Sequence, residues 1–207
     1  MATRFAIAAA AVFCLVAGAH AQNASAGNGK KASYASIIVA GGCFWCVEAD
    51  FEKLDAVTSA VSGYSGGLTE NPTYRAVTKG DTGHLEVVKV YYDPSATTYR
   101  ALVEFFLRTI DPLDDGGQFC DRGSSYRTAI FAETADERAA ALEAVAAAEQ
   151  KLGKKIVTPV RDRVKFWRAE EYHQDYYKKN RLKYSIYRSG CGRDKRLKQV
   201  WGDDAGA

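Results

Sequence analysis

Methionine is nearly absent from this chain of 207 residues, because Met1 is the only one. If the N-terminal leader described below is removed, no methionine remains to be oxidised. An excess of one charge is also missing, since 28 basic residues face 25 acidic ones and the formal net charge is +3. This balance argues against proteins that bind nucleic acid or anionic membranes through a strong basic field.

The N-terminus lacks an apolar run long enough to cross a bilayer, since residues 5–16 are too few. Arg4 precedes this run and Ala19-His20-Ala21 follows it, an order typical of a secretory signal peptide with an A-x-A cleavage site. We therefore expect residues 1–21 to be a signal peptide, and the protein to be periplasmic or secreted. Cleavage leaves 186 residues with a net charge of +2, enough for one domain with a substantial core.

Helical and extended patterns alternate along the rest of the chain. Residues 22–33 are mostly small and polar and predict a flexible lead, and residues 34–207 predict one domain with a C-terminal tail. Strands are expected at 37–40, 58–64, 85–91, 127–131 and 158–160, and helices at 43–54, 99–109, 134–152 and 170–179. Residues 111–125 predict a long loop, and the tail from Lys195 is expected on the surface. The class is therefore α/β (α+β).

The most informative segment is Gly42-Cys43-Phe44-Trp45-Cys46, directly after a buried strand. Val47, Phe51 and Leu54 continue it at helical spacing from Phe44, so Cys43 is expected at the first turn of a helix. Free N–H groups and the helix dipole at that end favour a thiolate, which is the reactive form of cysteine.

The cysteines allow several interpretations. Cys14 leaves with the leader, and Cys43, Cys46, Cys120 and Cys191 remain. Two structural disulfides could form in three pairings, although a chain of this length does not need such staples. A zinc site would need two further ligands, and no second paired spacing offers them, so we expect no metal.

A C-x-x-C at a helix start also fits a thioredoxin-like thiol–disulfide oxidoreductase. Against this alternative, no proline is suitably placed. Pro72, Pro94 and Pro112 fall in predicted turns or loops, and Pro159 is distant in sequence.

Further motifs follow in a fixed order after the first cysteine. They are Glu48, Gly63-Tyr64-Ser65-Gly66-Gly67, Asn71-Pro72-Thr73-Tyr74, Gly83-His84-Leu85-Glu86, Asp121-Arg122-Gly123 with Ser125-Tyr126-Arg127, and Glu171-Tyr172-His173-Gln174. The pattern spans about residues 37–177 and resembles the peptide methionine sulfoxide reductase A family. The resemblance implies a ferredoxin-like sandwich with extended loops, and reduction of the S-epimer of methionine sulfoxide, free or in oxidised proteins and peptides. It also implies no bound cofactor, and recycling by a thioredoxin-like protein or a dithiol.

The resemblance also assigns catalytic roles. Cys43 would attack the sulfoxide sulfur, and Glu86 would protonate the oxygen, because a carboxyl among aromatic rings has a raised pKa. Tyr74 and Tyr126 match the family's hydroxyl donors to the sulfoxide oxygen. Asp121 matches the family's pocket aspartate, which orients water or the substrate amide.

Phe44 and Trp45 would form the apolar pocket for the methyl group, although aromatic residues at a helix start are usually ordinary core. His84 and His173 are interpreted as structural histidines rather than ligands.

Attack should leave Cys43 as a sulfenic acid, which condenses with a nearby thiol. Cys46 stands where the family commonly has glycine, and a double-cysteine tail found in some members is missing. At i+3 from Cys43, Cys46 is the first candidate for the resolving thiol, and Cys191 is the second. Cys120 adjoins Asp121 and could also lie near the pocket. The sequence does not order these exchanges.

Overall fold

The computed structural model describes residues 1–3 and 34–206. The predicted signal peptide from residue 4 onward and the predicted lead at 22–33 lie outside the described residues. Within the described part, no helix combines the length and apolar character needed to cross a membrane.

A six-stranded mixed sheet forms the centre of the described domain, in the order β7-β6-β1-β3-β2-β8. The bounds are Ala35–Gly41 for β1, Val57–Ser65 for β2, Leu85–Tyr92 for β3, Thr128–Ala132 for β6, Val160–Asp162 for β7 and Trp167–Arg168 for β8. Only the β6–β7 pair is parallel among these strands. The units β1-α1-β2 and β3-α3-β6 interleave in the order β6-β1-β3-β2, which is the predicted ferredoxin-like arrangement.

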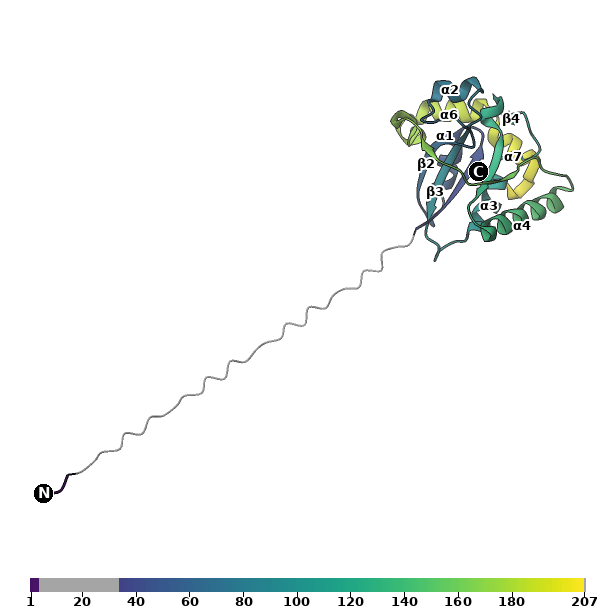
Figure 1. Cartoon of the computed structure of the whole chain (residues 1–207). Helices are drawn as coiled ribbons and strands as arrows, with labels where there is room; N and C mark the ends of the chain where they lie inside the picture. Colours follow the sequence, from purple (N-terminus) through teal and green to yellow (C-terminus); the bar gives the residue numbers. More distant parts are fainter. Residues whose placement is uncertain (4–33, 207) are drawn as a thin grey trace. The chain divides into compact units, whose positions relative to one another are not determined.

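Helices flank this sheet. Their bounds are Phe44–Phe51 for α1, Tyr74–Lys79 for α2, Tyr99–Arg108 for α3, Ala135–Leu152 for α4, Tyr176–Lys179 for α5, Arg181–Gly190 for α6 and Arg193–Trp201 for α7. Helices α3 and α4 lie side by side (Figure 1). Thr134 is the N-cap of α4, and its side chain accepts a hydrogen bond from the Glu137 N–H.

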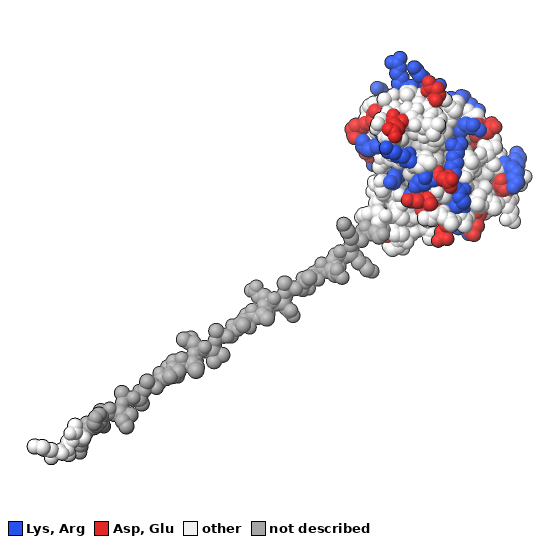
Figure 2. Space-filling view, viewed as in Figure 1, with Lys and Arg blue, Asp and Glu red and all other residues white. Residues whose placement is uncertain are grey.

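The core has two parts because strand side chains alternate between the faces of the sheet. Ile37 and Val39 of β1 pack into a large cluster with residues of α1, α3, α4 and α7. Ile38 and Ala40 point to the other face, in a smaller cluster that Phe166 covers. On the face shown in Figure 2, acidic and basic side chains are interspersed.

Three expectations about elements need correction. Helix α1 ends at Phe51, not near Leu54, and residues 170–179 form a 3₁₀ turn followed by the short α5. The predicted long loop at 111–125 contains a two-stranded ribbon of β4 (Gly117–Gln118) and β5 (Asp121–Arg122).

The surface placement of the tail from Lys195 is wrong. That segment belongs to α7, where Leu197 and Trp201 are buried and the Trp201 indole N–H donates to the Ile110 carbonyl (3.0 Å).

Candidate active site

The turn between β1 and α1 positions Cys43. Gly42 has φ +81°, and a Cβ on it would lie 2.5 Å from the Cβ of Gln118, so this tight turn requires glycine. Cys43 is the N-cap of α1, and its side chain makes no capping hydrogen bond. The thiol therefore lies at the helix start without accepting a hydrogen bond from the helix N–H groups.

A small cavity of about 60 Å³ lies over the Cys43 thiol. Its lining is mainly aromatic and acidic: Cys43, Phe44, Trp45, Tyr74, Glu86, Asp121, Tyr126 and Tyr187. All seven residues predicted for catalysis or the substrate pocket lie here, although they come from five separate segments of the chain. Tyr187 is the one lining residue that the sequence analysis missed.

Glu86 on β3 is fully enclosed beneath this cavity. Its Oε2 accepts a hydrogen bond from the Phe44 N–H at 3.0 Å. Burial raises the pKa of Glu86 to about 8, with smaller contributions from Asp121 and Cys46. Glu86 is therefore mostly protonated at neutral pH and can donate a proton into the cavity.

Two tyrosines approach the same cavity. Tyr74 and Tyr126 both line it, and burial raises the pKa of Tyr74 to about 12. The Tyr74 N–H donates to Glu170 at 2.8 Å, and the Tyr64 hydroxyl donates to the same carboxylate at 2.7 Å. Glu170 thus anchors the start of α2 and holds the Tyr74 ring over the thiol side of the pocket.

Asp121 and Tyr187 close the remaining side. The Tyr187 hydroxyl, from α6, donates a hydrogen bond to the Asp121 carboxylate and lines the cavity together with Cys43. Burial raises the pKa of Asp121 above its usual value. No motif marks Tyr187 in the sequence, because it is one of twelve tyrosines and lies 144 positions after Cys43.

The Trp45 ring is fixed from two sides. It stacks on Tyr176 with ring centroids 3.8 Å apart, and its indole N–H donates to Nδ1 of His173 at 3.1 Å. Burial lowers the pKa of His173 to about 4, so the imidazole is neutral and can accept this bond. His173 therefore has a structural role in orienting Trp45, and His84 likewise braces a turn by accepting from the Gly67 N–H.

The thiol of Cys43 differs from the expectation of a thiolate. Burial raises the pKa of Cys43 well above the usual value, and Cys46 and Glu86 raise it further. The helix-start argument fails here because the sulfur accepts no backbone N–H and faces acidic groups. These effects favour a neutral Cys43 thiol in the resting enzyme.

Cys43 and Cys46 are both free and buried, with 5% and 2% of their surface exposed. Cys120 and Cys191 instead form a disulfide, which joins the 111–125 loop to the corner between α6 and α7. Cys191, the second resolving candidate, is therefore unavailable as a free thiol in this state.

Two groups of side chains bring potential metal ligands together, Cys120–Asp121–Cys191 and Glu48–Glu52–Asp175. In the first group the two sulfurs are bonded to each other. In the second group, Lys178 forms an ion pair with Glu52 at 2.6 Å, and Glu48 accepts from the Asp175 N–H at 2.8 Å. These protein contacts occupy the ligand atoms, so neither group provides a metal centre.

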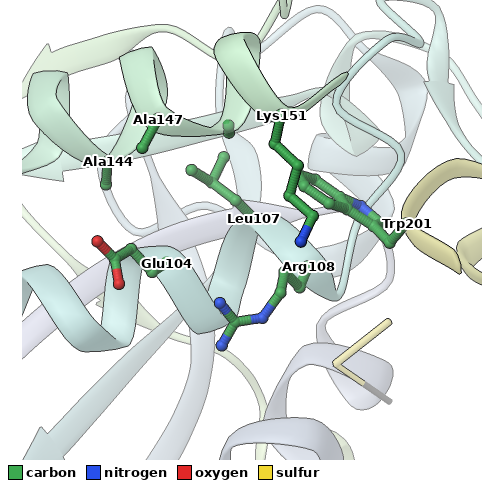
Figure 3. Close-up of a pocket in the computed structure, with 8 residues that line it drawn as sticks. Glu104, Leu107, Arg108, Ala144, Ala147, Lys151 and Trp201 are labelled. Carbon is green, nitrogen blue, oxygen red and sulfur yellow. The ribbon is translucent and has the colours of Figure 1, made fainter. Parts of the chain in front are cut away.

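A larger cavity, of about 230 Å³, lies between α3, α4 and the end of α7. Figure 3 shows Leu107, Lys151 and Trp201 around it. No cysteine lines it, so size does not identify the reactive site in this molecule.

A buried cysteine beside a protonated carboxyl and tyrosine hydroxyls defines a thiol-dependent oxidoreductase site. Comparison with known proteins identifies the family within this class of oxidoreductases. The model of the family described as peptide methionine sulfoxide reductase matches residues 35–205. Peptide methionine sulfoxide reductase MsrA 2 of Rhizobium meliloti is 50% identical over 168 residues, which cover 81% of this chain and 84% of the relative.

Solved structures agree with this match. Reduced Mxr1 from Saccharomyces cerevisiae superposes with a TM-score of 0.69 at 33% identity, covering 73% of this chain and 88% of Mxr1. Mxr1 in complex with Trx2 matches with a TM-score of 0.51 at 26% identity, covering 70% and 86%. The chain belongs to the peptide methionine sulfoxide reductase A family, and it is an oxidoreductase that reduces methionine sulfoxide.

Proposed function

We propose that this enzyme reduces the S-epimer of methionine sulfoxide, free or in oxidised proteins, through a sulfenic acid on Cys43 and then a Cys43–Cys46 disulfide. The observation that carries the proposal is the cavity itself, where a thiol, a protonated carboxyl and two tyrosine hydroxyls surround one small space. Family membership supports the same reaction.

The groups on the sulfoxide sulfur match different walls of the cavity. Phe44 and Trp45 offer apolar surface to the methyl group, while Glu86, Tyr74 and Tyr126 offer donors to the oxygen. With Cys43 facing the sulfur, methyl and oxygen cannot exchange places without losing these contacts. This asymmetry supports selection of one epimer at sulfur.

The reaction transfers the oxygen to Cys43. The Cys43 sulfur attacks the substrate sulfur while Glu86 gives its proton to the oxygen, which is a poor leaving group until it is protonated. Methionine sulfur gains the two electrons that Cys43 loses as it becomes a sulfenic acid. Asp121, through the Tyr187 hydroxyl, holds the thiol side of the site in place.

Cys46 is the proposed resolving thiol because, among the described residues, it is the other free cysteine and lies three residues after Cys43 in the first turn of α1. It attacks the sulfenic acid sulfur, a disulfide forms and water leaves. A thioredoxin-like protein or a dithiol then reduces the disulfide, and the Mxr1 structure in complex with Trx2 supports such a partner. The cycle requires no bound metal or organic cofactor.

The test is reduction of racemic methionine sulfoxide in a peptide with dithiothreitol, followed by chiral separation of the remaining sulfoxide. We expect loss of the S-epimer only, and no loss with Cys43→Ser. Tyr34→Phe serves as the control variant, because Tyr34 is exposed. Consumption of both epimers, or of neither by folded, reduced enzyme, would contradict the proposal.

Export is a separate part of the proposal, because it depends on the N-terminal pattern alone. Arg4, the apolar run at 5–16 and Ala19-His20-Ala21 support cleavage after Ala21 and a periplasmic or secreted enzyme. N-terminal sequencing of the protein recovered outside the cytoplasm should begin at Gln22. A start far from this position would contradict the predicted site.

A further inference from the structure

A buried cluster of charged side chains lies behind Cys46. Asp50, 0% exposed, forms ion pairs with Nη1 of Arg188 at 2.9 Å and with Nε of Arg193 at 3.7 Å. Arg193 is itself only 2% exposed, lies over the Phe119 ring at 4.5 Å and donates to the Thr109 carbonyl at 2.7 Å. Two guanidinium groups therefore share one fully buried carboxylate.

The positive charge of this cluster is not fully compensated. Arg188 has a second partner in the exposed Asp194, at 2.7 Å, whereas Arg193 has no carboxylate besides Asp50. Among the described residues, Nε of Arg193 and Oδ2 of Asp50 are both buried without a hydrogen-bond partner, and they face each other at 3.7 Å as a loose ion pair. Lys53 also pairs with Asp50, at 3.1 Å, so the cluster holds three cations and only two carboxylates, Asp50 and Asp194. A further anion beside this cluster would therefore be stabilised.

Cys46 is placed to be that anion. It lies one helical turn before Asp50 on α1, so both side chains lie along the same side of the helix. The charged and titratable groups around it are Arg188 and Arg193 from the C-terminal helices, Tyr184 of α6, Glu86 of β3, and Asp50 and Cys43 beside it. The cations are on the Cys46 side of the thiol pair, and the acid Glu86 raises the pKa of Cys43 instead.

We propose that Arg188 and Arg193 keep Cys46 as a thiolate in the reduced enzyme, and that this thiolate is the base that takes the proton of Cys43. The proposal rests on the proposed function above, and extends it by giving Cys46 a role before the resolving step. The hydrogen bond from Cys43, followed by the nearby guanidinium groups, lowers the pKa of Cys46 to about 7 against the effect of burial.

The proton and electron balance closes over the two steps. Cys46 accepts the Cys43 proton, the Cys43 sulfur attacks, and the Glu86 proton goes to the oxygen that ends on Cys43. This leaves a sulfenic acid, a Cys46 thiol, a Glu86 carboxylate and methionine. In the second step Cys46 attacks Cys43, the S–S bond forms, and the sulfenic acid hydroxyl leaves with the Cys46 proton as water.

The first test measures the ionisation of Cys46 directly. In the Cys43→Ser variant with the Cys120–Cys191 disulfide intact, Cys46 is the only free thiol of the described residues. We expect its ultraviolet thiolate absorbance to titrate near pH 7, and the midpoint to rise by about one pH unit or more when Arg193→Gln is added. Arg193→Lys should restore most of the effect, and Arg181→Gln, an exposed arginine on α6, is the matched control.

A midpoint at or above that of an ordinary thiol, about 8.5, would overturn the proposal whatever the catalytic activity. So would an unchanged midpoint in a folded Arg193→Gln variant.

The second test follows the first turnover, which does not need the resolving step. Enzyme reduced at Cys43 and Cys46 is mixed with methionine sulfoxide, and methionine is counted per enzyme in a quenched-flow experiment. We expect Cys46→Ser to slow this burst by about 100-fold or more, and Arg193→Gln to move its acid limb to higher pH. A normal burst rate in Cys46→Ser would leave Cys46 as a resolving thiol only, whereas no burst in the wild type would reject the proposed function itself.

Discussion

At the residue scale, the chemistry of the site depends on where three protons lie. Cys43 and Glu86 are protonated near neutral pH because they are buried close to other acidic groups. Cys46 differs in the proposed mechanism, because Cys43 and then the guanidinium groups paired with Asp50 lower its pKa. The site therefore holds a proton for the sulfoxide oxygen and a path for the proton of the attacking thiol before substrate arrives.

The first prediction concerns Glu86 as the acid. Since a general acid must be protonated, activity should fall as pH rises through the Glu86 pKa of about 8. This alkaline limb is separate from the acid limb that the Cys46 base would give. Glu86→Gln should lower kcat/KM by about 100-fold or more and remove this alkaline limb. The measurement is the pH profile of S-epimer reduction, with the exposed Glu143→Gln as control. An alkaline limb that persists in Glu86→Gln would assign it to another group.

The raised pKa of the Glu86 carboxyl should also lower the free energy of unfolding at high pH. Its pKa in the folded state, about 8, exceeds the ordinary value of 4.5, so the folded protein binds the extra proton between these values. Stability then decreases as pH rises from about 4.5 to 8. Relative to the wild type, the free energy of unfolding of Glu86→Gln should increase by about 3 kcal/mol between pH 5 and pH 8. Urea unfolding at both pH values tests this, and a gap that does not change with pH would contradict it.

Tyr187 should matter through its hydroxyl group alone. Tyr187→Phe keeps the ring against Trp45 but removes the hydrogen bond to Asp121. We expect a decrease of about tenfold in kcat, with little change in stability, because one charge-assisted bond is lost. Tyr91→Phe on β3 serves as the comparison. Unchanged kinetics in Tyr187→Phe would show that the Tyr187 hydroxyl has no role in catalysis.

The sequence predicted that Cys43, Glu86 and Tyr126 belong to one site, because each of them lies in a short motif. The same reasoning missed Tyr187, Arg188 and Arg193, which belong to no motif and reach the site only through the path of α6 and α7. It also assigned the wrong protonation to Cys43, because a helix dipole can be inferred from sequence order but burial beside Glu86 cannot.

At the element scale, the sheet and the long helices could be predicted, and the C-terminal region could not. An apolar run marks β1, β-branched and aromatic residues mark β3, and a capping residue marks α4. Helix α7 is highly charged, so its composition indicates solvent exposure, yet Leu197 and Trp201 at i and i+4 bury one side. The tail from Lys195 was predicted to lie on the surface because its charged composition was given more weight than the helical spacing of Leu197 and Trp201.

The Cys120–Cys191 disulfide should stabilise the link between two elements that supply Asp121 and Tyr187. The bridged cysteines are 71 residues apart in sequence, which restricts a large part of the unfolded chain. Replacing both with serine should lower the free energy of unfolding by about 2–4 kcal/mol. Non-reducing urea titration measures this. The first-turnover yield should remain one methionine per enzyme, and its loss in a folded variant would show that this disulfide takes part in the chemistry.

At the scale of the whole molecule, the last two helices complete the active site from outside the ferredoxin-like unit. Trp201 inserts into the main core and donates to Ile110, while Arg193 at the other end of α7 donates to the neighbouring Thr109 carbonyl. The end of α3 and the residues after it therefore receive both ends of α7. The position of Arg193 beside Asp50 depends on this docking.

Because the docking of α7 positions Arg193, Trp201 variants can separate the effect on core stability from the effect on the ionisation of Cys46. Trp201→Ala should cost about 3–5 kcal/mol of stability, because it removes a buried ring, whereas Trp201→Phe should cost much less. Loosening α7 should also move Arg193 away from Cys46, so the Cys46 titration in the Cys43→Ser background should shift to higher pH with Trp201→Ala. If stability falls but this midpoint stays near 7, Arg193 keeps its position without Trp201. In that case the contacts with Asp50 and Thr109 alone are sufficient to hold the guanidinium group at the thiol.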